Sequence, residues 1–203
     1  MRAKLAILDR DGTIIDVVRD EETGAIVTAF HPGQIRFLDG AIQGMQALRD
    51  QGFLLAIATN QPGPAKGQCS TTAVTRTNEA LVERLSKEGL TFSSVEVCMH
   101  HPLGGEGGDA SLVGPCRCRK PMPGLLEDGL RAAGADASSS WMIGDTRSDL
   151  DAARAAGTRA ALVFSSDRCE LCPLRGGPPG APDVHGSTLL VIAQKIAGLA
   201  RAG

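Results

Sequence analysis

The chain alternates short apolar segments with longer amphipathic ones. Segments 5–8 and 53–58 are continuously apolar, which is typical of strands covered on both faces of a parallel sheet. Further strands are predicted over 95–99, 140–143 and 159–164. Apolar residues at three- or four-residue spacing predict helices over about 39–52, 70–89, 121–134, 149–156 and 188–200. This alternation predicts an α/β fold, a doubly wound, three-layer parallel sheet.

Three irregular segments separate these elements. Residues 16–32 are polar and have no clear period, which predicts a loop or short hairpin with a possible strand at 25–29. Residues 100–115 form a Gly-rich insertion, and the Gly/Pro-rich residues 175–182 are expected only to connect the last strand to the terminal helix. We expect one domain over 1–203, with a flap at about 16–35, a loop at 98–118 and a C-terminal helix at about 188–200.

Composition and charge argue against polymer partners. The net charge is −2 and no run of Lys or Arg occurs, so no nucleic-acid footprint is visible. No apolar segment is long enough to span a bilayer, and the apolar run near the N-terminus is too short for a signal peptide. We therefore expect a cytoplasmic monomer that binds a small molecule and neither nucleic acid nor membrane. In a reducing compartment, its six cysteines favour metal binding over disulfides.

Polar side chains follow the predicted strands where these end. Asp9 and Asp11 follow the first strand, Thr59 the second and Asp145 the fourth, and Lys120 stands at the start of a helix. The carboxyl ends of parallel strands meet at one edge of the sheet, where ligands bind. By itself, the acidic pair also fits an ordinary turn. The whole set, however, matches phosphoryl transfer through a carboxylate, since a carboxylate that attacks a phosphate needs a divalent cation and a positive group on the far oxygens.

This chemistry assigns expected tasks to the polar residues. Asp9 and Asp145 would supply oxygen ligands to Mg²⁺. Lys120, the Thr59 hydroxyl and nearby backbone amides would hold the phosphate oxygens. Three neighbours of these groups are also candidates for substrate binding, namely Arg10, Asn60 and Gln61.

A second cluster lies in the Gly-rich insertion. Cys98-x-His100 and Cys116-x-Cys118 supply three thiolates and one imidazole, a closed tetrahedral set of the structural Zn²⁺ type. Such a site would stabilise a loop that has little core of its own. A disulfide or unrelated thiols are the alternatives, and the close Cys-x-Cys spacing argues against them.

The remaining cysteines lie outside this set. Cys169 and Cys172 have the spacing of a redox or metal hairpin, but two thiols do not complete a metal site, so inert surface thiols are favoured. Cys69 has no obvious base or helix start beside it, and we expect no special reactivity from it.

Four motifs resemble, in order and spacing, those of the haloacid dehalogenase phosphatase superfamily, over roughly residues 5–165. They are Asp9-x-Asp11-Gly12-Thr13, Thr59-Asn60-Gln61, Lys120 and Gly144-Asp145-x-x-x-Asp149. The resemblance implies a Rossmann-like sheet with Asp9 as the nucleophile that forms an aspartyl-phosphate. It implies that Asp11 is the general acid to the leaving group and then the base to water. It also implies that Mg²⁺ takes Asp9, the backbone carbonyl of Asp11 and Asp145, with Asp149 in support.

The phrases Cys98-Met99-His100-His101-Pro102 and 116–124 further resemble the D-glycero-D-manno-heptose 1,7-bisphosphate phosphatases and the related histidinol-phosphate phosphatases. This resemblance implies a core without a large cap domain, His100 rather than His101 as the zinc ligand, and Arg119 as a contact for a second phosphate or sugar hydroxyls. The expected reaction is removal of the C7 phosphate in nucleotide-activated heptose biosynthesis.

Three other functions compete with this expectation. Histidinol phosphate is the alternative substrate, but its cationic amine would favour acidic pocket residues over Arg119. A polynucleotide-end phosphatase would call for a basic groove that the sequence does not offer. A phosphosugar-binding regulatory or scaffold protein on the same fold is the non-enzyme alternative.

Overall fold

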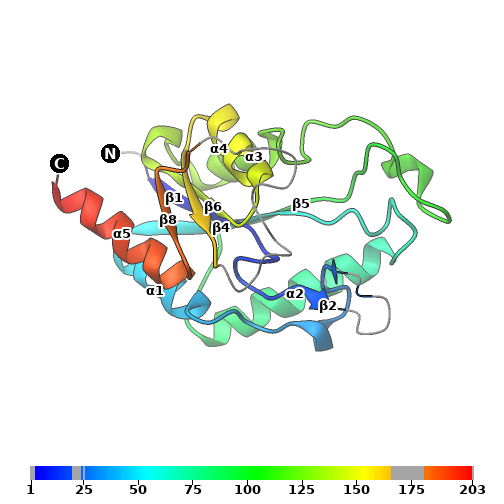
Figure 1. Cartoon of the computed structure of the whole chain (residues 1–203), viewed down its shortest axis with the longest axis horizontal. Helices are drawn as coiled ribbons and strands as arrows, with labels where there is room; N and C mark the ends of the chain where they lie inside the picture. The colour runs from blue at the N-terminus through cyan, green and yellow to red at the C-terminus, as the bar shows by residue number, and fades with distance from the viewer. Residues whose placement is uncertain (1–2, 20–23, 25, 166–180, 203) are drawn as a thin grey trace.

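The centre of the fold is a six-stranded parallel sheet with the strand order β5-β4-β1-β6-β7-β8 (Figure 1). The structure is a computed structural model that describes residues 3–19, 24, 26–165 and 181–202. The strands are β1 (Lys4–Leu8), β4 (Phe53–Asn60), β5 (Ser94–Cys98), β6 (Trp141–Gly144), β7 (Arg159–Val163) and β8 (Val184–Gly186). Leu8 of β1 is level with Ile57 of β4 and Ile143 of β6. The carboxyl ends of these three strands therefore lie side by side.

Helices cover both faces of the sheet and produce three layers (Figure 1). The helices are α1 (Ala41–Asp50), α2 (Thr71–Lys87), α3 (Gly124–Ala133), α4 (Arg147–Ala156) and α5 (Leu189–Ala202). α1, α2 and α5 share one core with Ala6 and Leu8 of β1, whereas α3 and α4 share the other with Leu5 and Ile7. Because successive side chains of β1 are buried on opposite faces, the strand is apolar throughout. The predicted doubly wound α/β fold is confirmed.

Short elements occupy the connections. β2 (Val18–Arg19) and β3 (Ile26–Val27) form an antiparallel hairpin after β1, as one reading of segment 16–32 predicts. The 3₁₀ helices are η1 (Pro32–Gln34), η2 (Ala110–Leu112) and η3 (Ala137–Ser139). Among the described residues, only β2, β3 and η1 separate β1 from α1, so this connection carries no large cap domain.

One strand and two helix starts differ from the sequence predictions. The sequence does not predict β8, because the three residues Val-His-Gly have no apolar pattern and are placed by pairing with β7. α4 begins at Arg147, since Thr146 and Asp149 form a capping box before it. α3 begins only at Gly124, with Pro123 as its N-cap residue.

Some predictions concern parts of the chain outside the described residues. Cys169 and Cys172 lie there, and so does most of the connecting segment 175–182. Within the residues that are described, none of the helices has both the length and the apolar character needed to cross a membrane.

Candidate active site

The end of β1 delivers Asp9 into a buried cluster of charges. Lys120 Nζ lies 2.9 Å from Asp9 Oδ1 and 2.6 Å from Asp149 Oδ1, and it donates a hydrogen bond to Ala58 O at 2.8 Å. Lys120 is 3% exposed and Asp149 is completely buried. A buried ammonium group is tolerated here because each of its three N–H groups has an acceptor. Lys120, the third motif, thus joins Asp9 of the first motif to Asp149 of the fourth.

The environment of this cluster shifts the pKa of two groups. Burial raises the pKa of Asp9 to about 7; the Lys120 cation opposes this shift and the Asp149 carboxylate adds to it. Burial alone would lower the pKa of Lys120, but Asp149 and Asp9 outweigh burial and raise it well above its usual value, so Lys120 is charged at neutral pH. One lysine faces more than one carboxylate, and a further cation beside Asp9 would favour its ionised form.

Carboxylates of the cluster fit a divalent metal. Oxygen atoms of Asp9, Asp145 and Asp149 all lie within 4.8 Å of one another. Asp149 is already committed to Lys120, and its Oδ2 accepts hydrogen bonds from Thr146 N at 3.0 Å and Thr146 Oγ1 at 2.6 Å. Asp9 and Asp145 are therefore the two carboxylates suited to a hard cation such as Mg²⁺.

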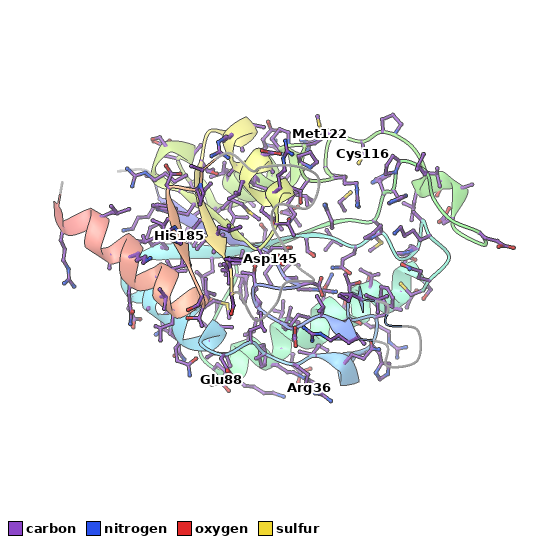
Figure 2. All side chains as sticks on the ribbon, viewed as in Figure 1. Arg36, Glu88, Cys116, Met122, Asp145 and His185 are labelled. Atoms are coloured by element: carbon purple, nitrogen blue, oxygen red, sulfur yellow. The ribbon has the colours of Figure 1, made fainter. Side chains whose placement is uncertain are left out.

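Gly12 is required for the close approach of Asp145. Its φ is 82°, a left-handed conformation that favours glycine, and a Cβ built on it would overlap the Asp145 carboxylate. Figure 2 shows Asp145 among the strand ends at the centre of the molecule. The glycine of the first motif thus has a direct steric reason to stand there.

Asp11 belongs to a second network, on Arg10 and Gln61. Its carboxylate accepts hydrogen bonds from Arg10 Nε at 3.0 Å, from a terminal Arg10 nitrogen at 3.1 Å and from Gln61 Nε2 at 2.6 Å. The sequence predicts substrate contacts for Arg10 and Gln61, but both side chains are completely buried, and their polar atoms bind groups of the protein. The structure thus gives both side chains protein partners next to Asp11, and a direct contact with the substrate stays a prediction.

Thr59 and Asn60 are the last two residues of β4, and their side chains make different contacts. Thr59 Oγ1 accepts a hydrogen bond from Gln61 Nε2 at 2.8 Å, so its own hydroxyl hydrogen remains available for another acceptor. The Asn60 amide brackets the backbone of Lys120: it donates to Lys120 O at 3.0 Å and accepts from Lys120 N at 3.1 Å. Asn60 therefore holds the loop of Lys120 against β4, and the substrate contact expected of it stays a prediction.

The Cys/His set predicted for zinc comes together beyond β5. Cys98 Sγ lies 3.0 Å from Cys118 Sγ and 3.8 Å from Cys116 Sγ, and His100 Nδ1 lies 3.8 Å and 3.4 Å from the Sγ atoms of Cys98 and Cys118. Ligands arranged as a tetrahedron around Zn²⁺ would be about 3.5–3.8 Å apart, so two of these four distances match, the 3.4 Å distance is slightly short and the 3.0 Å distance is clearly short. None of the described cysteines forms a disulfide.

Protein groups around the Cys/His cluster also favour metal binding. Arg119 N donates a hydrogen bond to Cys116 Sγ at 3.4 Å, a contact typical of a metal-bound thiolate. Burial and the neighbouring Cys118 raise the pKa of Cys98, so a cation would be needed to keep that thiol ionised. His101 stands apart: its Nδ1 accepts from Leu103 N at 3.3 Å. Cys116 and its loop lie away from Asp145 in Figure 2.

Two cations, Lys66 and Arg119, act electrostatically on His101. Burial and the Lys66 and Arg119 cations lower the pKa of His101, which indicates that the three groups interact. A terminal nitrogen of Arg119 also donates to His100 O at 3.2 Å. Arg119 immediately precedes Lys120, so one of these cations stands in the chain next to the residue that pairs with Asp9.

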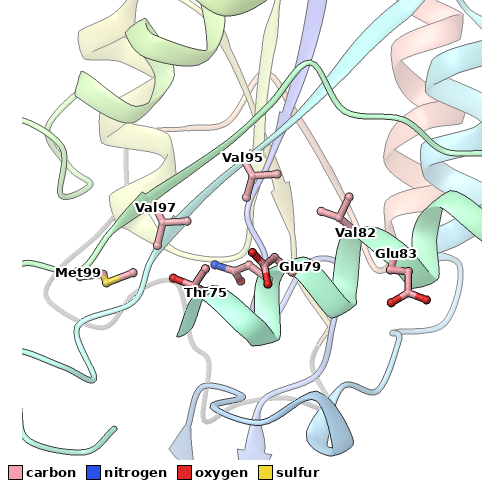
Figure 3. Close-up of a pocket in the computed structure, with 8 residues that line it drawn as sticks. Thr75, Glu79, Val82, Glu83, Val95, Val97 and Met99 are labelled. Carbon is pink, nitrogen blue, oxygen red and sulfur yellow. The ribbon is translucent and has the colours of Figure 1, made fainter. Parts of the chain in front are cut away.

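A cavity of about 480 Å³ lies elsewhere, between α2 and β5. Figure 3 shows Val82 of α2 and Val95 and Val97 of β5 among the side chains that line it. Its lining includes none of the carboxylates described above, so cavity size does not locate the chemistry. The lining does include Asn78, whose Oδ1 accepts a hydrogen bond from Arg10 at 2.7 Å.

Asn78 is the polar residue that sequence reasoning missed. It lies on α2, at the spacing of the apolar residues Val74, Leu81 and Leu85, and it is 6% exposed. A polar side chain on the buried face of an amphipathic helix is the one available signal, because such a group needs a hydrogen-bond partner. Its partner, Arg10, is 68 residues away in the sequence and is not evident without the fold.

Comparison with known proteins links this arrangement to sugar-phosphate phosphatases. Residues 117–170 match the HAD-hydrolase-like family. The chain is 32% identical over 149 residues to D-glycero-beta-D-manno-heptose-1,7-bisphosphate 7-phosphatase of Yersinia pestis, which covers 73% of each chain. It is also 32% identical over 166 residues to the protein of that name from Pasteurella multocida (strain Pm70), which covers 81% of this chain and 83% of the relative.

The fold agrees with an experimental structure. It matches D,D-heptose 1,7-bisphosphate phosphatase from B. bronchiseptica, complexed with magnesium and phosphate, with a TM-score of 0.76 and 26% identity. The match covers 97% of this chain and 99% of the other.

Proposed function

Because the chain belongs to the D-glycero-β-D-manno-heptose-1,7-bisphosphate 7-phosphatase family, we propose that it removes the C7 phosphate of this sugar bisphosphate for nucleotide-activated heptose biosynthesis. The observation that carries the proposal is the juxtaposition of Asp9, Lys120, Asp149 and Asp145 at the strand ends. This set provides a carboxylate, a fixed cation and oxygen ligands for a metal at one place.

Asp9 is the proposed nucleophile. Its Oδ1 is held by Lys120 and by Arg10 N at 2.8 Å, which fixes the carboxylate in front of the incoming phosphorus. Mg²⁺, held by Asp9, Asp145 and the Asp11 carbonyl, would neutralise charge on the phosphate and so allow an anion to attack it. The Thr59 hydroxyl would donate to another phosphate oxygen, and Lys120 would exchange one of its present acceptors for a phosphate oxygen as charge develops there.

Asp11 is the proposed proton carrier. As Asp9 Oδ attacks phosphorus, the bond from phosphorus to the C7 oxygen breaks, and Asp11 donates its proton to that oxygen. In the second step Asp11 takes a proton from water, which attacks the aspartyl-phosphate and releases inorganic phosphate and free Asp9. A sugar alkoxide is a poor leaving group, and general acid catalysis of this kind contributes about 10²–10⁴ in rate.

Two basic side chains support a bisphosphate over histidinol phosphate. Lys66 and Arg119, the two cations that act on His101, would attract a second phosphate group, whereas they would repel the cationic amine of histidinol phosphate. We propose that Arg119 contacts the distal phosphate or the sugar hydroxyls.

Zinc is proposed as a structural ion on Cys98, His100, Cys116 and Cys118. The four ligand atoms lie within 4.8 Å of one another, and together they leave no position for water. The ion would fix the loop that carries Arg119 and Lys120.

The test is phosphate release from heptose 1,7-bisphosphate and from histidinol phosphate, each with and without Mg²⁺. We expect Mg²⁺-dependent release from the bisphosphate, far slower turnover of histidinol phosphate and none by Asp9→Asn. Preference for histidinol phosphate would refute the substrate assignment. Equal, slow release by the wild type and Asp9→Asn on both compounds would leave only a phosphosugar-binding role.

A further inference from the structure

Arg10 is a buried cation that points into the protein. Its side chain is completely buried, and its guanidinium donates to Asn78 Oδ1 at 2.7 Å, to Ala29 O at 3.0 Å and to Gln61 Oε1 at 2.9 Å, in addition to Asp11. These acceptors come from α2, from the segment after the β2–β3 hairpin and from the end of β4. Arg10 thus connects three separate parts of the chain to one carboxylate.

The bonds to Asp11 fix that carboxylate in one orientation. Oδ2 accepts from Arg10 Nε and from Gln61 Nε2, while Oδ1 accepts from one terminal nitrogen of Arg10. A carboxylate oxygen has two lone pairs, so Oδ1 keeps one that none of the described residues uses. The Asp11 side chain is 10% exposed, which leaves a narrow access for a reacting group.

Stability alone does not account for this arrangement. Removing a guanidinium from water carries a large cost, and well-packed apolar residues at such positions are often as stable as a buried ion pair or more so. The arrangement is explained if the reaction requires one orientation of the Asp11 carboxyl group, since a bidentate pair fixes the plane of a carboxylate.

We propose that Arg10, Gln61 and Asn78 are positioning residues that hold Asp11 so that the proton carried at the remaining position of Oδ1 points at the leaving-group oxygen; this rests on the proposed acid–base role of Asp11. Gln61 ties Asp11 to Thr59, so the acid is placed relative to the bound phosphate. Asn78 holds Arg10 from α2 and acts on the reaction only through Arg10 and Asp11.

Asn78→Leu tests the proposal with little steric risk, because Asn78 borders the cavity between α2 and β5. We expect kcat/KM for heptose bisphosphate to fall about 10- to 100-fold, as misplacement of a reacting group by about 1 Å does. For 4-nitrophenyl phosphate we expect a fall below about threefold, because an aryl oxide leaves without a proton and needs little general acid catalysis. Asn78→Asp keeps an acceptor for Arg10 and should recover most of the loss.

Thr77→Val is the matched control. Thr77 precedes Asn78 on α2 and is completely buried, but its hydroxyl donates to Ala73 O within the helix and has no part in the Arg10 network. It should change the melting temperature without changing the ratio of the two kcat/KM values. If Asn78→Leu lowers both kcat/KM values equally, or leaves both unchanged, positioning of Asp11 is refuted.

A double-mutant cycle separates this inference from the proposed function. In an Asp11→Asn background, Asn78→Leu should have no further effect on the heptose substrate, because the group it aims is gone. Full additivity of the two losses would refute the inference. If Asp11→Asn itself keeps wild-type kcat/KM on the heptose substrate, the acid–base role fails, whatever Asn78→Leu does.

Discussion

Lys120→Met should both destabilise the protein and abolish most of its activity. The substitution removes a cation that lies 2.9 Å from Asp9 and 2.6 Å from the completely buried Asp149. Removing one partner of a buried ion pair costs about 3–5 kcal/mol, because the remaining charge is unpaired. We expect the free energy of unfolding of the metal-free protein to fall by that amount. Loss of a preorganised charge at the transferred phosphate should lower kcat by about 10²–10³.

A second substitution separates the two effects. Adding Asp149→Asn removes one of the unpaired charges, so the double variant should be more stable than Lys120→Met alone by roughly 1–3 kcal/mol. It should remain as inactive as the single variant, because the phosphate still lacks its cation. Stability would therefore recover without activity.

Urea unfolding in the presence of a chelator, followed by circular dichroism, measures the stability of the wild type, of the two single variants and of the double variant, and phosphate release measures their activity. A midpoint of Lys120→Met equal to that of the wild type would refute the strong coupling of these charges. So would a double variant whose destabilisation is the sum of those of the two single variants.

Three further predictions concern the metals and the first motif. Gly12→Ala should abolish Mg²⁺-dependent turnover, because its Cβ would overlap the Asp145 carboxylate; normal activity would show that the loop can move aside. Because burial raises the pKa of Asp9 to about 7 and a proton competes with the metal, Mg²⁺ affinity measured by calorimetry should rise with pH up to about 7 and then level off. A Mg²⁺ affinity that does not change with pH across that range would contradict the raised pKa of Asp9. Metal analysis should find about one zinc per chain, and Cys118→Ser should lower the zinc content and expose the loop to proteolysis; a variant that keeps its zinc and its protease resistance would exclude the site.

Local pattern was sufficient to predict the layers of the fold but not its last strand. β1 and β4 are buried on both faces, and strands of this kind have continuous apolar runs that can be recognised in the sequence. β8 has no such pattern, since its three residues are placed by pairing with β7 and not by their own preference. Short strands of this kind depend on contacts that become visible only in the folded chain.

In the candidate site, too, some residues are placed by local pattern and others by tertiary contacts. Residues whose placement follows from strand ends, such as Asp9 and Asp145, meet where the sequence predicts, because parallel strands align their carboxyl ends. Arg10 and Gln61 stand within the same motifs, yet their side chains turn inward to bind Asp11. The direction of a side chain next to a turn depends on the partners that the tertiary fold supplies, and one of those is Asn78, from a helix that no motif includes.

The first motif places two carboxylates only two residues apart, yet they depend on different parts of the protein. Asp9 is held by the loop of Lys120, and Asp11 by Arg10, Gln61 and the α2 helix. The residues that serve attack on the phosphoryl group and those that serve departure of the alcohol can therefore change independently among descendants of this sequence. Changes on α2 could adapt the enzyme to an alcohol of different basicity while the machinery that receives phosphorus stays as it is.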